Sequence, residues 1–201
     1  MIKPQALKEI LRVFMTLQWT KELPRQGFLF FGFKRNEVDS VAAHTYTTTL
    51  LAYFLATQLK KEGTKIDVEK VIKMGLLHDL GETIIGDIGQ SAKQFAGPKT
   101  IHDIEDRAIQ TLLADLEFKG EMFKLVKEYN KRETLEAKLV KVCDNLDALA
   151  LATTVPGADM KYIGPLKGLV AKQSPLSFYQ EAAKLILDRK IKPFREWTKD
   201  A

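Results

Sequence analysis

The apolar residues of this chain recur at helical spacing along nearly all of its length, and this periodicity limits the fold more than any other feature. Residues 4–20 show it clearly, because Leu7, Leu11 and Phe14 would share one face of a helix. The same spacing predicts further helices over residues 39–61, 68–80, 101–115, 120–130, 134–153, 161–172 and 176–189. We therefore expect an all-α fold of six to eight helices.

Local signals mark several helix ends and two breaks in the pattern. Ser40 or Asp39 is expected to cap the helix over 39–61, and Asp67 the next one. Thr100 with Asp103 resembles a capping box that opens a helix near residue 101. The aromatic stretch 24–36 predicts a short extended segment or a loop anchored in the core, and the glycines of 81–90 predict a turn-rich segment.

Length and composition fit one ordinary domain that spans all 201 residues. The single cysteine excludes an internal disulfide, and with no signal peptide in view we expect a cytoplasmic protein. No apolar run approaches the roughly 18 residues that a membrane span needs, so no membrane partner is expected. The net charge of +5 suits either an anionic ligand or an ordinary solvated surface.

Polar residues gather at the end of the helix predicted over 68–80. His78 and Asp79 follow an apolar stretch, and Glu82 stands one helical turn further on. Asp87 lies in the tight sequence Gly-Asp-Ile-Gly. A polar cluster at a helix end is the simpler interpretation, but one histidine and three carboxylates beside an apolar helix favour a functional site.

Two residues from distant helices can complete this site. His44 shares the apolar face of the helix over 39–61, where a histidine taken alone is most often a packed core residue. Asp144 lies among small and apolar residues on a second face of the helix over 134–153, and burial of an unpaired carboxylate is costly. Two imidazoles and two carboxylates, from His44, His78, Asp79 and Asp144, suit one divalent transition metal such as Mn, Co, Ni, Fe or Zn.

The order His, then His-Asp, then Asp resembles the HD superfamily of metal-dependent phosphohydrolases. The run Ser40–His44, the stretch 76–88 and Lys141-Val142-Cys143-Asp144 are similar to its 5'-deoxynucleotidase branch. The resemblance covers roughly residues 5–190 and implies a single HD domain.

The resemblance implies a role for each matching residue. His44, His78, Asp79 and Asp144 would hold one metal, with Asp79 also counted as catalytic, and Glu82 would position or deprotonate the attacking water. The sugar would be held by four consecutive residues, Asp87, Ile88, Gly89 and Gln90. The products would be phosphate and a nucleoside, in the branch a deoxynucleoside, and the resemblance also implies a homodimer.

Two positions depart from the branch. Ala43 stands before His44, where the branch often has an acid. The Arg-Trp pair that bacterial members use on phosphate and sugar is replaced by Glu-Leu-Pro-Arg at 22–25. Arg25 is therefore the candidate phosphate contact, with Lys93 or Arg35 as rivals.

Two alternatives stay open from the sequence. One is a related enzyme, an HD phosphodiesterase or a nucleoside triphosphohydrolase. The other is an interaction or nucleic-acid-binding module with a vestigial metal site, which the basic charge permits and the complete ligand set argues against. We expect a small nucleotide as the partner and not a nucleic acid.

Overall fold

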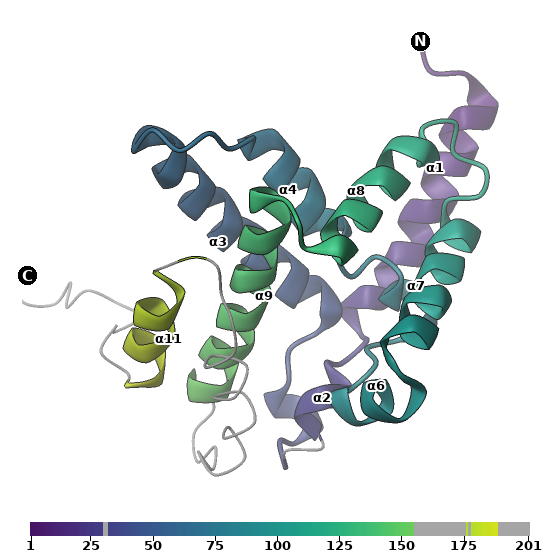
Figure 1. Cartoon of the computed structure of the whole chain (residues 1–201). Helices are drawn as coiled ribbons and strands as arrows, with labels where there is room; N and C mark the ends of the chain where they lie inside the picture. Colours follow the sequence, from purple (N-terminus) through teal and green to yellow (C-terminus); the bar gives the residue numbers. More distant parts are fainter. Residues whose placement is uncertain (30–31, 155–175, 177, 189–201) are drawn as a thin grey trace, which may run out of the picture.

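The computed structural model describes residues 1–29, 32–154, 176 and 178–188, and the regular elements in these ranges are helical, as expected (Figure 1). A single isolated bridge between Pro24 and Ser40 is the exception within the described residues. The α-helices are α1 (Pro4–Leu17), α2 (Gln26–Leu29), α3 (Val41–Lys61), α4 (Val68–Leu77), α5 (Glu82–Ile85), α6 (Gln90–Ala96), α7 (Pro98–Leu112), α8 (Lys119–Lys131), α9 (Leu135–Thr154) and α11 (Tyr179–Leu187). Two 3₁₀ helices, η1 (Gln18–Lys21) and η2 (Arg35–Glu37), complete the set.

The helix starts agree with the predicted caps in two of three cases. The Ser40 hydroxyl accepts a hydrogen bond from the backbone N–H of Ala43, and the Asp67 carboxylate accepts one from that of Lys70. The capping box expected at Thr100 is wrong, because α7 begins at Pro98 and Thr100 lies inside it. Proline suits the first position of a helix, where its missing N–H has no partner to lose.

The two predicted breaks contain more helix than the sequence indicated. Residues 24–36 include α2 and the first two residues of η2, so the extended-segment interpretation is wrong, whereas the expected anchoring in the core is provided by Phe28 and Phe33. These two rings pack edge to face with centroids 5.3 Å apart. Residues 81–90 include α5 and the start of α6, and α6 was not predicted. The helix expected over 161–172 lies outside the described residues.

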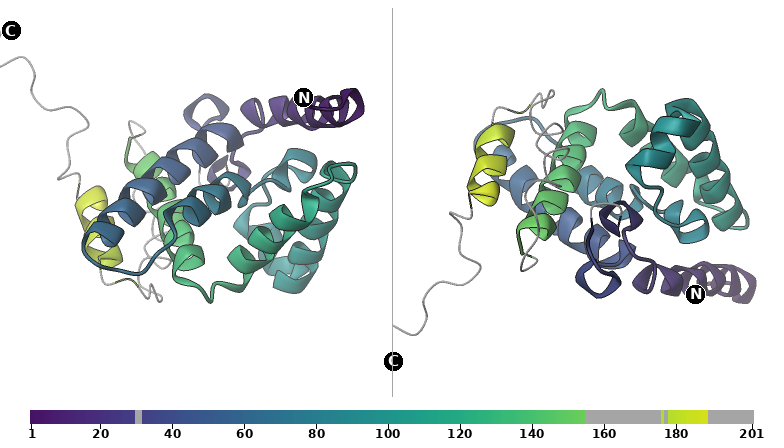
Figure 2. Two further views of the ribbon diagram at one scale, coloured as in Figure 1. Left: turned by 90° about the horizontal axis from the view of Figure 1, so that it is seen from above. Right: turned by 90° about the horizontal axis from the view of Figure 1, so that it is seen from below.

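Helices α3, α4 and α9 pack together in the middle of the molecule (Figure 1). The α3–α4 contact depends on Gly75, because a Cβ there would lie 2.8 Å from Oγ1 of Thr49. Helix α8 packs on α4 and α9, α11 covers another side of α9, and α7 packs against α5 and α6 (Figure 2). This packing brings together the start of α3, the end of α4 and the middle of α9.

Helix α9 is buried on two faces, as its sequence predicted. Leu139, Leu146 and Leu149 are almost fully buried on one side, and Val140 with other small residues is buried on the other. Asp144 belongs to the second face and is only 9% exposed. The fold therefore places a carboxylate in the interior, where it needs a positive partner.

Candidate functional site

His44 is fully buried on α3, and its two ring nitrogens face different partners. Nδ1 lies 2.6 Å from Oδ2 of Asp147, whose other oxygen accepts a hydrogen bond from the Thr47 hydroxyl. A carboxylate can only accept, so the Asp147 contact favours a proton on Nδ1, although the donor Nη1 of Arg25 lies 2.9 Å from the same nitrogen. The Nε2 lone pair is thereby turned toward Asp79 and Asp144, each with an oxygen 3.4 Å away.

His78 follows the last residue of α4 and is oriented in a similar way. Its Nδ1 lies 2.7 Å from the carbonyl oxygen of Gly75, which also can only accept. When the ring is neutral, its Nε2 therefore carries a lone pair, and this atom lies 3.3 Å from Nε2 of His44 and 3.1 Å from Oδ2 of Asp79. Two neutral rings in this arrangement repel each other through their lone pairs unless a proton or a metal ion lies between them.

The charges of the cluster are strongly coupled. Burial raises the pKa of Asp79, but the positive charges of His78 and His44 hold it well below its usual range. Burial also raises the pKa of Asp144, and Lys141 together with a hydrogen bond to His44 lowers it more. Burial lowers the pKa of His44, and hydrogen bonds to the surrounding carboxylates raise it well above its usual range. The site thus holds ionised acids that demand a positive charge.

This donor set fits a divalent cation. His44, His78 and Asp79 each offer one ligand atom, and these atoms lie within 4.8 Å of one another. Asp144 contacts the imidazole of His44. Nitrogen and oxygen donors in equal number suit the transition metals from Mn to Zn. A hydrogen-bond partner behind each imidazole, Asp147 or the Gly75 carbonyl, fixes the ring in the orientation that a metal needs.

Arg25 lies beside this cluster. Its Nη1 is 2.9 Å from Nδ1 of His44 and 3.5 Å from Asp147, and its Nη2 is 3.8 Å from Asp144. Burial lowers the pKa of Arg25, but the surrounding carboxylates, Asp144 first, raise it above its ordinary value. The guanidinium is therefore already engaged by the acids of the site.

Glu82 is buried at the start of α5, only 7% exposed. Burial, helped by the negative charges of Asp79 and Asp87, raises the pKa of Glu82 to about 10. The backbone N–H of Gly27 donates to Oδ2 of Asp87 at 3.0 Å. This bond ties the loop after α5 to the start of α2 and sets Asp87 near the turn that follows Arg25.

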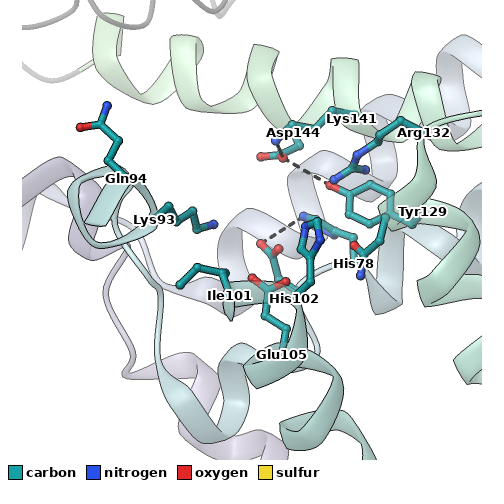
Figure 3. Close-up of a pocket in the computed structure, with 12 residues that line it drawn as sticks. His78, Lys93, Gln94, Ile101, His102, Glu105, Tyr129, Arg132, Lys141 and Asp144 are labelled. Carbon is teal, nitrogen blue, oxygen red and sulfur yellow. Dashed lines mark hydrogen bonds and ion pairs between the residues drawn. The ribbon is translucent and has the colours of Figure 1, made fainter. Parts of the chain in front are cut away.

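A cavity of about 430 Å³ opens beside the cluster (Figure 3). Asp79, His78 and Asp144 form part of its wall. Lys93 extends from α6 toward the cavity, and Tyr129 and Arg132 lie on the opposite side, at the end of α8 (Figure 3). The cavity therefore combines the carboxylates of the cluster with basic side chains.

The remaining predicted residues fall into two groups. Ile88 and Gly89 follow Asp87 at the entry to α6, and Gln90 begins that helix, with its side chain outside the described part. Arg35 is exposed and donates to the carbonyl oxygen of Glu22. The structure does not bring Arg35 to the lining of this cavity.

Sequence reasoning left one contributor open and missed another. The sequence leaves Asp147 open, as a solvated residue or as a support of the metal ligands, and its contact with Nδ1 of His44 is that of a support. Its spacing of three residues from Asp144 on one helix was the available signal. Arg132 was not considered, since nothing in the sequence around it connects it to the cluster.

None of the helices in the described ranges is both long and apolar enough to cross a membrane.

The fold and the site together define an all-helical domain built around a His–Asp cluster. The sequence profile of the HD domain family matches residues 17–166, and the chain belongs to that family. Among curated proteins, it is 31% identical over 132 residues to the 5'-deoxynucleotidase HDDC2 of Danio rerio, covering 66% of this chain and 62% of that protein. It is 34% identical over 136 residues to the protein of that name from Dictyostelium discoideum, covering 66% of this chain and 70% of that one.

Solved structures agree on the fold. A conserved hypothetical protein from Pyrococcus furiosus superposes with a TM-score of 0.72 at 32% identity, over 90% of this chain and 99% of that one. A predicted metal-dependent phosphohydrolase from Magnetospirillum magnetotacticum superposes with a TM-score of 0.69 at 20% identity, over 92% and 95% of the two chains. The second likeness concerns the fold alone.

Proposed function

We propose that this protein is a metal-dependent phosphohydrolase that releases inorganic phosphate from nucleoside 5'-monophosphates, with deoxyribonucleotides preferred. The observation that carries the proposal is the convergence of His44, His78, Asp79 and Asp144 beside a buried Glu82, at the wall of a cavity with basic residues. The curated relatives named 5'-deoxynucleotidases support the choice of substrate class.

His44, His78, Asp79 and Asp144 would hold one divalent cation. When bound, the cation supplies positive charge for the phosphate oxygens and lowers the pKa of a water molecule. Oδ2 of Asp79 lies close to Nε2 of both imidazoles, so this carboxylate would bind the same cation as the two rings. Asp147 keeps the proton of His44 on Nδ1, which leaves Nε2 able to bind.

Glu82 is the residue placed to move a proton. Its raised pKa keeps the carboxyl protonated at neutral pH when no cation is present. Positive charge among the neighbouring ligands would lower this pKa, because it stabilises the carboxylate. Glu82 would then take a proton from the attacking water and return it to the leaving oxygen.

The substrate contacts follow from the arrangement around Asp87. The Gly27 N–H occupies Oδ2 of Asp87, and this leaves Oδ1 to accept a hydrogen bond from a sugar hydroxyl. Ile88, Gly89 and Gln90 would continue this contact surface along the entry to α6. Lys93 and Arg25 would add positive charge near the phosphate.

The test is phosphate release from dAMP, dCMP, TMP, dUMP and AMP, with a generic diester and a nucleoside triphosphate as the alternatives. Each is assayed with Mn, Co, Ni, Zn, Fe and Mg. We expect monophosphates to be hydrolysed with a transition metal, deoxynucleotides fastest, and Asp144→Ala to be inactive. Hydrolysis of the diester or the triphosphate alone would overturn the substrate class, and no hydrolysis with any metal would favour an interaction module. The homodimer stays a prediction, which sedimentation equilibrium measures.

A further inference from the structure

Arg132 has a backbone conformation that is unfavourable for its residue type. It caps the C-terminus of α8 with φ 58° and ψ 27°, in the left-handed region. Within the described part of the chain, it is the one residue other than glycine with a positive φ. Glycine or asparagine normally fills this position after a helix, because a Cβ is strained there. An arginine at this point is therefore best explained by what its side chain does.

The side chain of Arg132 is held in place and left with one unpaired donor. Its Cζ lies 3.3 Å from the centroid of the Tyr129 ring, a stacked arrangement that fixes the plane of the guanidinium. Its Nη1 is buried and has no hydrogen-bond partner in the described structure. Buried polar groups are nearly always paired, so this unpaired donor indicates a missing acceptor.

The Arg132 side chain lies at the edge of the metal-ligand cluster, since it lines the same cavity as His78, Asp79 and Asp144. The Tyr129 hydroxyl, on the ring that carries the guanidinium, donates to Oδ2 of Asp144 at 3.4 Å. Arg132, Tyr129 and Asp144 line the same cavity (Figure 3). The stacked guanidinium is thus set beside the proposed reaction centre.

The other basic side chains near Asp144 are already paired. Arg25 contacts Asp144 and Asp147, and Lys141 donates to Asp144 at 2.6 Å. Lys93 approaches the cavity from α6, on the other side from Arg132 (Figure 3). Arg132 is consequently the guanidinium that keeps an unpaired donor, Nη1, for an incoming anion.

We propose that Arg132 binds the phosphate group of the substrate and of the phosphate product, with Tyr129 as the platform that orients it. The assignment rests on the proposed function for the identity of the anion as a nucleotide phosphate. It differs from the candidates taken from the sequence, Arg25, Lys93 and Arg35, in resting on an unpaired donor and on a strained backbone.

The experiment compares full-length wild type with Arg132→Gly and Arg132→Lys, each loaded with Mn²⁺. Lys127→Ala is the matched control, since it removes one positive charge from an exposed position on the same helix. Titration calorimetry measures binding of inorganic phosphate, thermal unfolding measures stability, and steady-state kinetics with a monophosphate gives KM and kcat.

Arg132→Gly is expected to bind phosphate at least about tenfold more weakly, the loss of one or two charged hydrogen bonds, and to raise KM. Its melting temperature is expected to match or exceed that of wild type, because glycine relieves the left-handed strain. Arg132→Lys keeps the charge but not the stacked fork, and we expect a several-fold loss. A purely structural arginine would show the opposite, lower stability with unchanged phosphate binding.

The outcomes separate this inference from the proposed function. Phosphate affinity within twofold of wild type in both Arg132 variants overturns the inference, even if nucleotides are hydrolysed. Binding of phosphate that depends on Arg132, in a protein that hydrolyses none of the nucleotides, supports the inference and overturns the proposed function. A wild type that does not bind phosphate at millimolar concentration overturns the inference directly.

Discussion

Replacing Glu82 with glutamine is expected to stabilise the metal-free protein and to abolish phosphate release. Burial raises the pKa of Glu82 from 4.5 to about 10, so the folded state holds a proton that the unfolded state has lost across that pH range. The free energy of unfolding therefore decreases as pH rises from 4.5 toward 10. Glutamine is neutral at every pH and carries no such cost.

The size of this stabilisation at neutral pH follows from the unfolded-state pKa of 4.5 alone. Each pH unit above 4.5 costs the wild type about 1.4 kcal/mol, so at pH 7 the cost is about 3 kcal/mol, an upper estimate that does not depend on the precise folded value. In a chain of this length about 3 kcal/mol corresponds to a rise in melting temperature on the order of 10 °C. The advantage of Glu82→Gln is expected to disappear near pH 4.5 and to grow with pH.

The assay is thermal unfolding in EDTA at pH 5, 6, 7 and 8, with phosphate release measured separately after metal is restored. Glu133→Gln is the control, because Glu133 is exposed and its replacement should leave stability unchanged. A Glu82→Gln protein that melts at or below the wild-type temperature at pH 8 would refute the argument from burial. A fully active variant would refute the catalytic role.

Three further predictions concern the supports of the site. Asp147→Ala should weaken metal binding by about 10- to 100-fold, because Nδ1 of His44 loses its acceptor; an unchanged Kd in a chelator competition would contradict this. Metal affinity should rise from pH 6 to pH 8, because a proton competes with the metal for the imidazole of His44, whose pKa is raised. Titration calorimetry at each pH tests this, and an affinity that does not change with pH would contradict it. Gly75→Ala should lower the free energy of unfolding in urea by about 1–3 kcal/mol, because the added Cβ would meet Oγ1 of Thr49. A second substitution, Thr49→Ala, should recover part of this loss. A Gly75→Ala protein as stable as wild type would show that α3 and α4 tolerate the change.

Helical periodicity predicted the long elements well, although α1 leaves Leu7, Leu11 and Phe14 of its predicted apolar face largely exposed. The starts of α3 and α4 followed from Ser40 and Asp67, whose side chains accept hydrogen bonds from the backbone of their own helices. The short helix α6 was missed since it has few residues, an exposed Phe95 and no apolar face long enough to show a period. At Thr100, local capping chemistry competed with Pro98, and proline opened the helix earlier.

The candidate site was predictable where an acid stands in an apolar setting. Asp79 and Asp144 were identified in this way, and the structure brings both to His44. The contact of Asp147 depends on which side of α9 faces α3, a tertiary fact that spacing alone does not decide. The position of the Arg132 side chain depends on the left-handed backbone conformation of this residue after α8, and the residue type arginine does not predict that conformation.

The most direct test of the account is the metal content of the protein. The purified chain is stripped with EDTA, dialysed against Mn²⁺ or Co²⁺ and analysed for bound ion, in parallel with Asp144→Ala whose fold is checked by circular dichroism. We predict one tightly bound ion per wild-type chain and none in the folded variant. A wild type without bound ion, or an Asp144→Ala protein that retains it with equal affinity, would contradict the convergence of these four side chains on a single cation.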